Sequence, residues 1–158
     1  MNPATQARLE RALGSSVRGC RPLSGGDINE AFGLSLADGR QVFAKINTRA
    51  PASFFEAEAR GLAWLAEPGV LRVPAVLAVA EPGPHGASAF LVLEWLEPAA
   101  RANDFDERLG LGLAALHRAG AASFGLDQPN FIALLPQDNE SSPSWPEFWR
   151  ERRLVPLL

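Results

Sequence analysis

The chain has 158 residues, of which 47% are hydrophobic and 21% are charged, and its formal net charge is −3. This length fits one domain or part of a larger protein, and the composition excludes disordered, collagen-like and disulfide-rich chains. The charge gives no sign of a nucleic-acid partner, and no run approaches the roughly 18 apolar residues of a membrane span. The chain opens without a signal-peptide pattern. Its one cysteine, Cys20, cannot form an internal disulfide, so we expect a cytoplasmic protein in which Cys20 packs within the fold.

The first hundred residues predict an antiparallel sheet. Residues 3–13 predict a short amphipathic helix that ends at Gly14, and residues 17–47 predict three strands. The Asp38-Gly39 pair is typical of the tight turn between two antiparallel strands. The next predicted elements are a helix over 51–67 and apolar strands over 74–80 and 88–94. We therefore expect five strands, with the helix over 51–67 packed on the sheet.

The character of the chain changes after residue 97. Residues 104–119 predict a helix with two internal glycines, Gly110 and Gly112, each of which costs about 1 kcal/mol relative to alanine. The glycines favour close packing against a neighbouring element over an isolated surface helix. The remaining segments are a loop-like stretch over 120–143 and the start of a further helix over 145–154.

One cation stands out, because Lys45 is the single lysine among the basic residues and all the others are arginines. A compact ammonium suits tight sites that the planar guanidinium of arginine does not fit. At about 100° per residue, Glu58 falls between Leu62 and Leu65 on the apolar face of its helix, whereas Glu56 falls on the solvent face. A buried carboxylate needs a partner, and Lys45 on the preceding strand is the nearest candidate. Two interpretations stay open: a Lys45–Glu58 ion pair, or a Glu58 side chain that reaches water at the edge of the helix.

Seven stretches carry a family resemblance. They are LSGGDINEAFGL (23–34), VFAKIN (42–47), FFEAEARGLAWL (54–65), RVPAVLAV (72–79), FLVLEWLE (90–97), LHR (116–118) and FGLDQPNFIALLPQDNESSPSWPEFWRERRL (124–154). Through them the chain resembles the N-terminal half of the fructosamine kinase, or ketosamine kinase, family of the protein-kinase-like superfamily. The last stretch is the most specific, because its Pro-Gln-x-Asn and Trp…Phe…Arg-Arg-Leu patterns are not general to kinases.

The resemblance implies an α+β fold of the protein-kinase type. Residues 1–97 would form the N-lobe, a five-stranded antiparallel sheet plus one packed helix, with the nucleotide loop and the inter-lobe linker. Residues 98–158 would form the first helical part of an incomplete C-lobe. On this view the chain is an N-terminal fragment, and an exposed apolar face would contact the missing C-lobe or a second copy of the chain.

ATP is the implied nucleotide, and a loop, a strand and a helix would bind it. Gly25 and Gly26 would open the nucleotide loop, where backbone N–H groups can approach phosphates closely because glycine has no Cβ. Lys45 would contact the α- and β-phosphates, and Glu58 would orient Lys45. Without the resemblance, the Gly25-Gly26 pair is equally typical of a plain hairpin turn.

The resemblance also implies contacts to adenine and to the substrate. The Glu94 carbonyl and the Leu96 N–H of the inter-lobe linker would face adenine, although the pattern alone favours a buried strand with an exposed end. Five residues would shape the site for the sugar-amine substrate, namely Asn130, Gln137, Asn139, Trp145 and Arg152. The alternative for these five is a surface loop followed by an ordinary helix. Ala133 departs from the family, which commonly has glycine at this position.

The sequence lacks the residues that carry out phosphoryl transfer. The family draws its catalytic aspartate and its Mg²⁺ ligands from a His-Gly-Asp loop and a later Asp-Pro-Ala motif, and neither motif occurs in the 158 residues. We therefore expect no catalytic residue and no metal site in this chain.

The implied parent protein would use ATP and Mg²⁺ to phosphorylate the 3-hydroxyl of a fructosamine or ribulosamine, either a small molecule or a glycated protein. Two alternatives stay open. One is a stand-alone module that binds a nucleotide or a partner, and the other is a kinase for aminoglycosides or choline-like alcohols. Neither membrane nor nucleic acid is expected as a partner.

Overall fold

The computed structural model describes residues 1–24 and 28–158. The expected nucleotide loop at Gly25 and Gly26, together with Asp27, lies outside the described residues. The chain divides into two compact units, Met1–Trp64 with Val73–Ala100 and Leu65–Arg72 with Arg101–Leu158. Across the described residues, every helix is too short or too polar to cross a membrane.

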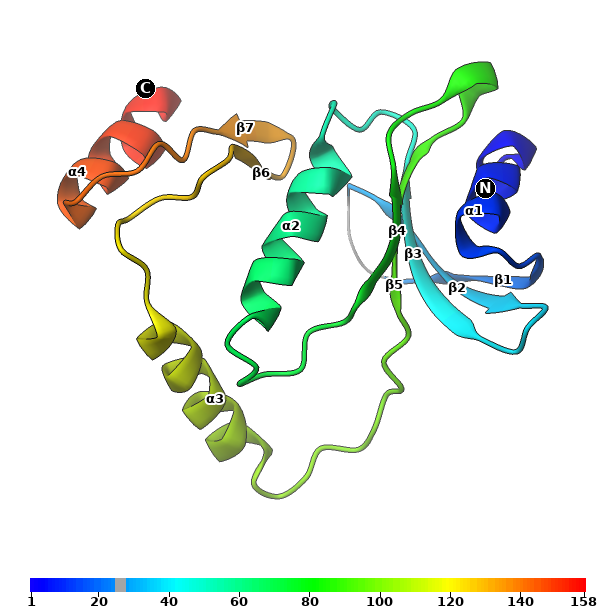
Figure 1. Ribbon diagram of the computed structural model, residues 1–158, viewed down its shortest axis with the longest axis horizontal. Helices are drawn as coiled ribbons and strands as arrows, with labels where there is room; N and C mark the ends of the chain where they lie inside the picture. Colours follow the sequence, from blue (N-terminus) through cyan, green and yellow to red (C-terminus); the bar gives the residue numbers. More distant parts are fainter. Residues whose placement is uncertain (25–27) are drawn as a thin grey trace. The chain divides into compact units, whose positions relative to one another are not determined.

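The first unit contains a five-stranded antiparallel sheet (Figure 1). The strands are β1 (Val17–Leu23), β2 (Glu30–Leu36), β3 (Gln41–Asn47), β4 (Val76–Ala80) and β5 (Ala89–Glu94). They lie in the order β1-β2-β3-β5-β4, and each neighbouring pair is antiparallel. The sheet predicted from the sequence is confirmed.

Helix α1 (Pro3–Leu13) packs on one face of this sheet. The Asn2 side chain caps its N-terminus by accepting a backbone N–H at 2.8 Å, and Gly14 ends the helix with a left-handed φ of 67°. Leu9 and Leu13 of α1 pack in one apolar core with residues that recur at alternate positions of the strands. These strand residues are Phe32, Leu34, Leu36, Val42, Ala44, Ile46, Phe90 and Val92.

Helix α2 (Phe54–Ala66) lies on the opposite face of the sheet (Figure 1). Residues that pair directly across antiparallel strands share a face. The pairing of Lys45 with both Ala31 and Leu91 therefore puts all three side chains on the α2 face. The sequence predicts one helix packed on the sheet. The structure adds a second, because the N-terminal helix α1 encloses the apolar core on the other face.

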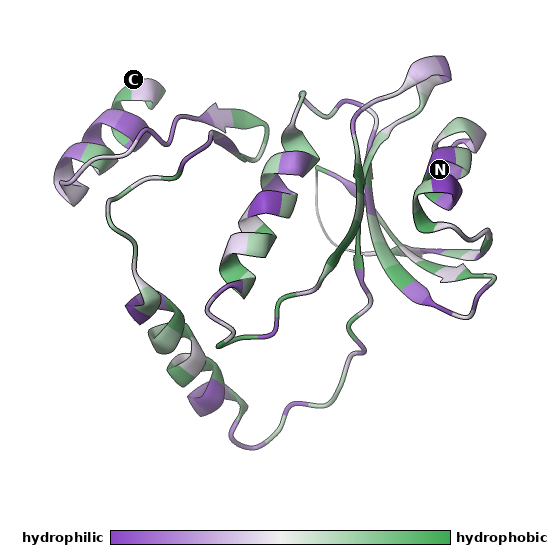
Figure 2. Ribbon diagram, viewed as in Figure 1, coloured by the Kyte–Doolittle hydropathy of each residue, from purple (hydrophilic) through white to green (hydrophobic). Residues whose placement is uncertain are grey.

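Strand β5 is apolar along nearly its whole length (Figure 2), and every residue from Ala89 to Leu93 is buried. It has strands on both sides and helices over both faces, which explains its continuous apolar run. In contrast, β1 lies at the edge of the sheet, and Cys20 on β1 is exposed. The expectation that Cys20 packs within the fold is therefore wrong.

The second unit is mostly irregular. Its elements are α3 (Phe105–Ala119), β6 (Asn130–Ile132), β7 (Leu135–Gln137), α4 (Trp145–Trp149), the π turn η2 (Arg150–Leu154) and the 3-10 turn η3 (Val155–Leu157). The β6–β7 hairpin corrects the prediction of a loop over 120–143. Strands of three residues are too short to show the alternation that identifies a strand in sequence.

Candidate functional site

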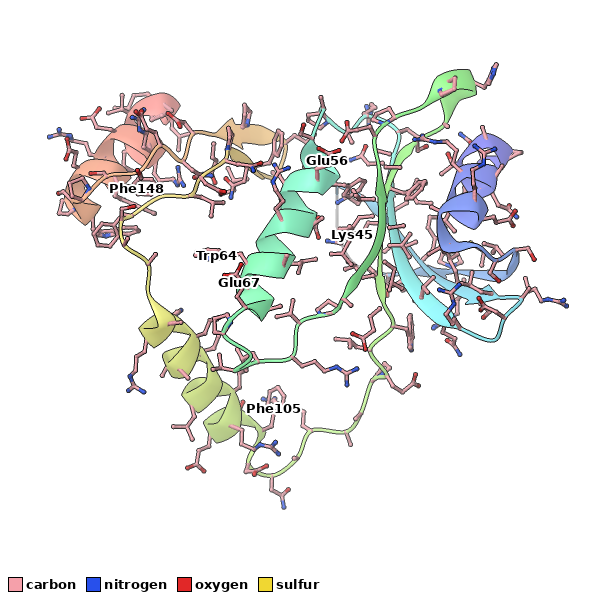
Figure 3. All side chains as sticks on the ribbon, viewed as in Figure 1. Lys45, Glu56, Trp64, Glu67, Phe105 and Phe148 are labelled. Carbon is pink, nitrogen blue, oxygen red and sulfur yellow. The ribbon has the colours of Figure 1, made fainter. Side chains whose placement is uncertain are left out.

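The predicted ion pair on the α2 face of the sheet is present in the first unit. Lys45 Nζ donates to Glu58 Oε1 at 2.5 Å, and each side chain keeps 29% of its surface exposed. Glu56 is 45% exposed, with its Oε2 4.0 Å from a guanidinium nitrogen of Arg60 on the next turn. In Figure 3 the Lys45 side chain lies on the side of the sheet that carries α2. The helical phase therefore identified which of the two glutamates faces the sheet.

The surroundings of the pair are apolar. Leu91, the cross-strand neighbour of Lys45, is fully buried, and Phe55 at the start of α2 is 1% exposed. Low local polarity strengthens the attraction between an ammonium and a carboxylate, and it also makes a missing partner costly. Glu58 occupies one of the three N–H donors of the Lys45 ammonium. The arrangement can hold an ammonium in a fixed place for a polyphosphate.

The start of α2 is held beside the strand β4. The Ser53 N–H donates to both carboxylate oxygens of Glu81, each at 3.1 Å, and Glu81 directly follows β4. Ser53 has a positive φ of 62°, which only a constrained non-glycine residue adopts. Arg8 of α1 donates to the Glu81 carbonyl at 2.8 Å. These contacts fix the end of α2 that precedes Glu58.

A buried amide lies two residues beyond Lys45. Asn47 ends β3, is 8% exposed, and donates its side-chain amide to the Ile28 carbonyl at 3.2 Å and to Asn29 Oδ1 at 2.9 Å. Its own Oδ1 accepts the Arg49 N–H at 2.7 Å. The sequence analysis did not identify Asn47. The signal was available, since strand period places residues 45 and 47 on one face.

The expected inter-lobe linker continues β5. The Glu94 N–H donates to the Ala75 carbonyl at 2.8 Å, and the Ala75 N–H donates to the Glu94 carboxylate at 3.2 Å, so strand pairing extends beyond β4. Leu96 is 38% exposed. Between them, Trp95 packs over Gly33, where an added Cβ would lie 3.2 Å from the indole ring. The backbone of Glu94 and Leu96 thus lies at the end of the strand next to β3, which carries Lys45.

Three of the residues expected at the substrate site meet in the second unit. Asn139 is 3% exposed and donates its amide to the Gln128 carbonyl at 2.9 Å and to Asn130 Oδ1 at 3.0 Å. Asn130 pairs with Gln137 in the β6–β7 hairpin. Arg153, which the sequence analysis missed, donates to Asn139 Oδ1. Asn139 therefore uses its donors and its acceptor within the protein.

The other two expected substrate residues lie in and just after α4. Arg152 forms ion pairs with Asp138, at 2.7 Å, and with Glu140. Trp145 is 48% exposed, and its ring centroid lies 5.6 Å from that of Phe124 and 5.3 Å from that of Trp149. The exposed indole is available for contact, whereas Arg152 is already paired.

The hairpin between β6 and β7 contains the residue that departs from the family pattern. Ala133 has a φ of 55°, in the left-handed region that glycine adopts without a steric cost. The glycine that the resemblance implies at this position would adopt that backbone conformation without strain.

Groups of three or more His, Cys, Asp or Glu residues that could hold a metal ion are absent from the described residues. The described residues offer an ion-paired ammonium at Lys45 and an exposed aromatic side chain at Trp145 for contacts to a ligand.

The comparisons with known proteins agree with this geometry. The family model described as "Fructosamine kinase" matches residues 1–158. A probable ketoamine kinase of Synechocystis is 43% identical over 139 residues, which cover 85% of this chain and 44% of that protein. A probable ketoamine kinase of Thermus thermophilus is 42% identical over 151 residues, which cover 95% of this chain and 51% of that protein.

A solved structure is also similar. The crystal structure of a candidate fructosamine-3-kinase from Thermobifida fusca superposes with a TM-score of 0.80 at 31% identity, covering 99% of this chain and 53% of that one. The chain spans about half the length of the relatives that it matches. Its fold is thus the kinase-like α+β fold that the sequence predicts, and the chain belongs to the fructosamine kinase family.

Proposed function

We propose that this chain forms the nucleotide-binding half of a ketosamine kinase, which phosphorylates the 3-hydroxyl of fructosamine or ribulosamine adducts with ATP. One observation carries the proposal: the single lysine of the chain lies 2.5 Å from Glu58 on the helix-covered face of the sheet. A strand lysine paired to a helix glutamate is the arrangement by which protein kinases hold the α- and β-phosphates. The named activities of the relatives supply the substrate class.

The proposal assigns a part of the nucleotide to each segment. Lys45, oriented by Glu58, contacts the α- and β-phosphates, and the backbone of Gly25 and Gly26 approaches the same phosphates. The Glu94 carbonyl and the Leu96 N–H contact adenine from the inter-lobe linker. This division places the nucleotide lobe in residues 1–97 and the first part of the helical lobe in residues 98–158.

The same proposal makes this chain inactive by itself. The described residues offer no cluster for a metal ion, and the sequence contains neither His-Gly-Asp nor Asp-Pro-Ala. Phosphoryl transfer requires a carboxylate near the attacking hydroxyl and ligands for the metal that accompanies ATP. We propose that a whole protein supplies both, with Mg²⁺ as the metal, from residues beyond this chain.

On the substrate side we assign different roles to the five expected residues. Trp145 offers an exposed aromatic surface for the sugar, since aromatic side chains commonly line small-molecule sites. Asn139 is buried and fully hydrogen-bonded, so it shapes the segment without contacting the substrate. Asn130, Gln137 and Arg152 support the same segment through the hairpin and the ion pairs.

An exposed apolar face on α3 is the proposed contact to the rest of a whole protein. The helix has no buried residue, and the exposed apolar side chains of Phe105, Leu109 and Leu113 fall on one face at about 100° per residue. Exposed apolar patches commonly mark an interface. We expect the 158-residue chain to self-associate in sedimentation velocity experiments. A thermally robust monomer would instead favour a stand-alone module.

The nucleotide site is tested by calorimetric titration of the 158-residue chain with ATP. Lys45→Ala should weaken ATP binding at least about tenfold, because charged hydrogen bonds contribute roughly 1.5–3 kcal/mol. Arg60→Ala, an exposed cation on the solvent side of α2, is the matched control and should bind like the wild type. A wild-type chain that does not bind ATP would refute the nucleotide site.

Catalysis is tested in the same protein with a radiolabelled γ-phosphate and a fructosamine. No labelled product should form above background. Product that appears with the wild type and disappears with Lys45→Ala would show that this chain is a complete catalyst.

A further inference from the structure

Asn47 is a buried polar side chain that the proposed contacts to ATP do not use. It is 8% exposed, and its amide donates to the Ile28 carbonyl and to Asn29 Oδ1, while its Oδ1 accepts the Arg49 N–H. Side-chain hydrogen bonds of this kind span 18 and 19 residues of sequence. A buried amide with three partners fixes the segments that it joins, because any displacement would leave a polar group unsatisfied.

The position of Asn47 connects two parts of the proposed nucleotide site. Asn47 and Lys45 are two residues apart on β3, so their side chains lie on the same face of the sheet. Ile28 and Asn29 are the first described residues after Gly25 and Gly26. The strand that carries the ammonium therefore also carries the amide that holds the segment following the glycine pair.

We propose that Asn47 is a positioning residue for the phosphate groups of the nucleotide. By holding Ile28 and Asn29 against the end of β3, it fixes this segment relative to Lys45 on the same strand. The inference rests on the proposed nucleotide site and adds to it a residue that touches no ligand. Its effect should be specific to phosphates, since the inter-lobe linker that faces adenine leaves the opposite end of the central strands.

A second asparagine offers a matched control. Asn139 in the other unit is also buried, and it too donates to one backbone carbonyl and to the Oδ1 of one asparagine. Alanine at either position removes two donated hydrogen bonds and one accepted hydrogen bond without changing the net charge. The accepted bond comes from the Arg49 backbone N–H at Asn47 and from the Arg153 guanidinium at Asn139. A purely structural role predicts the same consequence for ligand binding from both substitutions.

The experiment measures the affinity of the 158-residue chain for ATP and, separately, for adenosine by calorimetric titration. Asn47→Ala should lower the affinity for ATP about tenfold, because a displaced segment would cost the phosphates about one charged hydrogen bond. The affinity for adenosine, which has no phosphate, should stay unchanged. Asn139→Ala should leave both affinities unchanged. Asn29→Ala, which removes one of the two acceptors, should give a smaller loss for ATP and serves if Asn47→Ala fails to fold.

The outcomes separate the two proposals. If the wild type binds ATP and Asn47→Ala or Asn29→Ala binds it equally well, the role of Asn47 is overturned and the nucleotide site stands. The same holds if ATP and adenosine lose affinity by the same factor. If the wild type does not bind ATP, the nucleotide site itself is overturned.

Discussion

The two units of the chain bury different kinds of side chain. In the first unit, α1 and alternate strand positions enclose an apolar core that includes the fully buried Leu9, Ala44 and Val92. In the second unit only Asn139 and Phe148 are buried, and Phe148 lies under the guanidinium of Arg153, whose carbon is 4.7 Å from the ring centroid. The first unit therefore depends on burial of apolar surface, and the second on directional polar contacts.

This difference determines how each unit should respond to substitution. Apolar packing is non-directional, so its cost on truncation follows the volume removed. A polar cluster fails when a single donor is lost, because the remaining buried groups keep their desolvation cost without a partner. A polar substitution in the second unit should thus have a measurable effect, although a smaller one than a core truncation in the first.

The largest expected effect is Leu9→Ala in the apolar core of the first unit. Leu9 is fully buried between α1 and the sheet, so the cavity and the lost contacts should reduce the free energy of unfolding by about 2–5 kcal/mol. Urea titration followed by circular dichroism measures the loss. Arg11→Ala, at an exposed position of the same helix, should change stability by less than about 0.5 kcal/mol. Equal losses for the two variants would deny a core between α1 and the sheet.

Asn139→Ala tests the polar side of the comparison. It removes the hydrogen bonds of Asn139 to the Gln128 carbonyl and to Asn130 Oδ1 and the one that it accepts from Arg153, at a cost of about 1–3 kcal/mol. Hydrogen exchange should become faster at the Leu126 amide, which donates to the Asn139 carbonyl, and stay slow across β2, β3 and β5. If the sheet amides exchange faster by the same factor, the two units are not independent in stability.

Glu58→Ala probes a polar contact placed within the apolar unit. Lys45 would lose its partner, and since both side chains are 29% exposed we expect a cost of about 1–3 kcal/mol, less than for a fully buried pair. Glu58→Gln should cost less, because the amide keeps an acceptor for the ammonium.

Glu56→Ala on the same helix is the control for that substitution. Glu56 is 45% exposed and 4.0 Å from Arg60, so its loss should cost less than about 0.5 kcal/mol. Thermal unfolding of the three variants in one buffer gives the ranking. If Glu56→Ala lowers stability as much as Glu58→Ala does, the two faces of α2 would not differ in the way that we propose.

The first unit could be predicted from the sequence because burial there follows a period. Phe32, Leu34 and Leu36 occupy alternate positions of β2 and share its buried face, and the helical phase placed Glu58 toward the sheet. The same period also puts Asn47 on the face of Lys45, but a buried amide carries no apolar pattern and its partners lie before β2. A polar residue at an inward position is the signal that could have revealed it.

The second unit could not be predicted in the same way. Its contacts join Asn139 to Asn130 and Arg153, and a hydrogen bond between distant polar residues leaves no periodic mark in the chain. The family resemblance identified Asn130 and Asn139 as residues of the substrate site. It did not indicate that the two side chains are hydrogen-bonded to each other.

The smallest expected effect concerns two glycines of α3. An added Cβ at Gly110 meets open space, whereas at Gly112 it would lie 2.4 Å from Leu71 Cδ2 within the same unit. Both alanine substitutions gain about 1 kcal/mol of helix propensity, but at Gly112 the Leu71 side chain must move, which costs a comparable amount. Gly110→Ala should therefore raise the free energy of unfolding by up to about 1 kcal/mol. Gly112→Ala should leave the free energy of unfolding nearly unchanged, because its gain and its cost cancel. Denaturant titration of the two variants measures the difference. Equal gains would mean that Leu71 does not pack against α3.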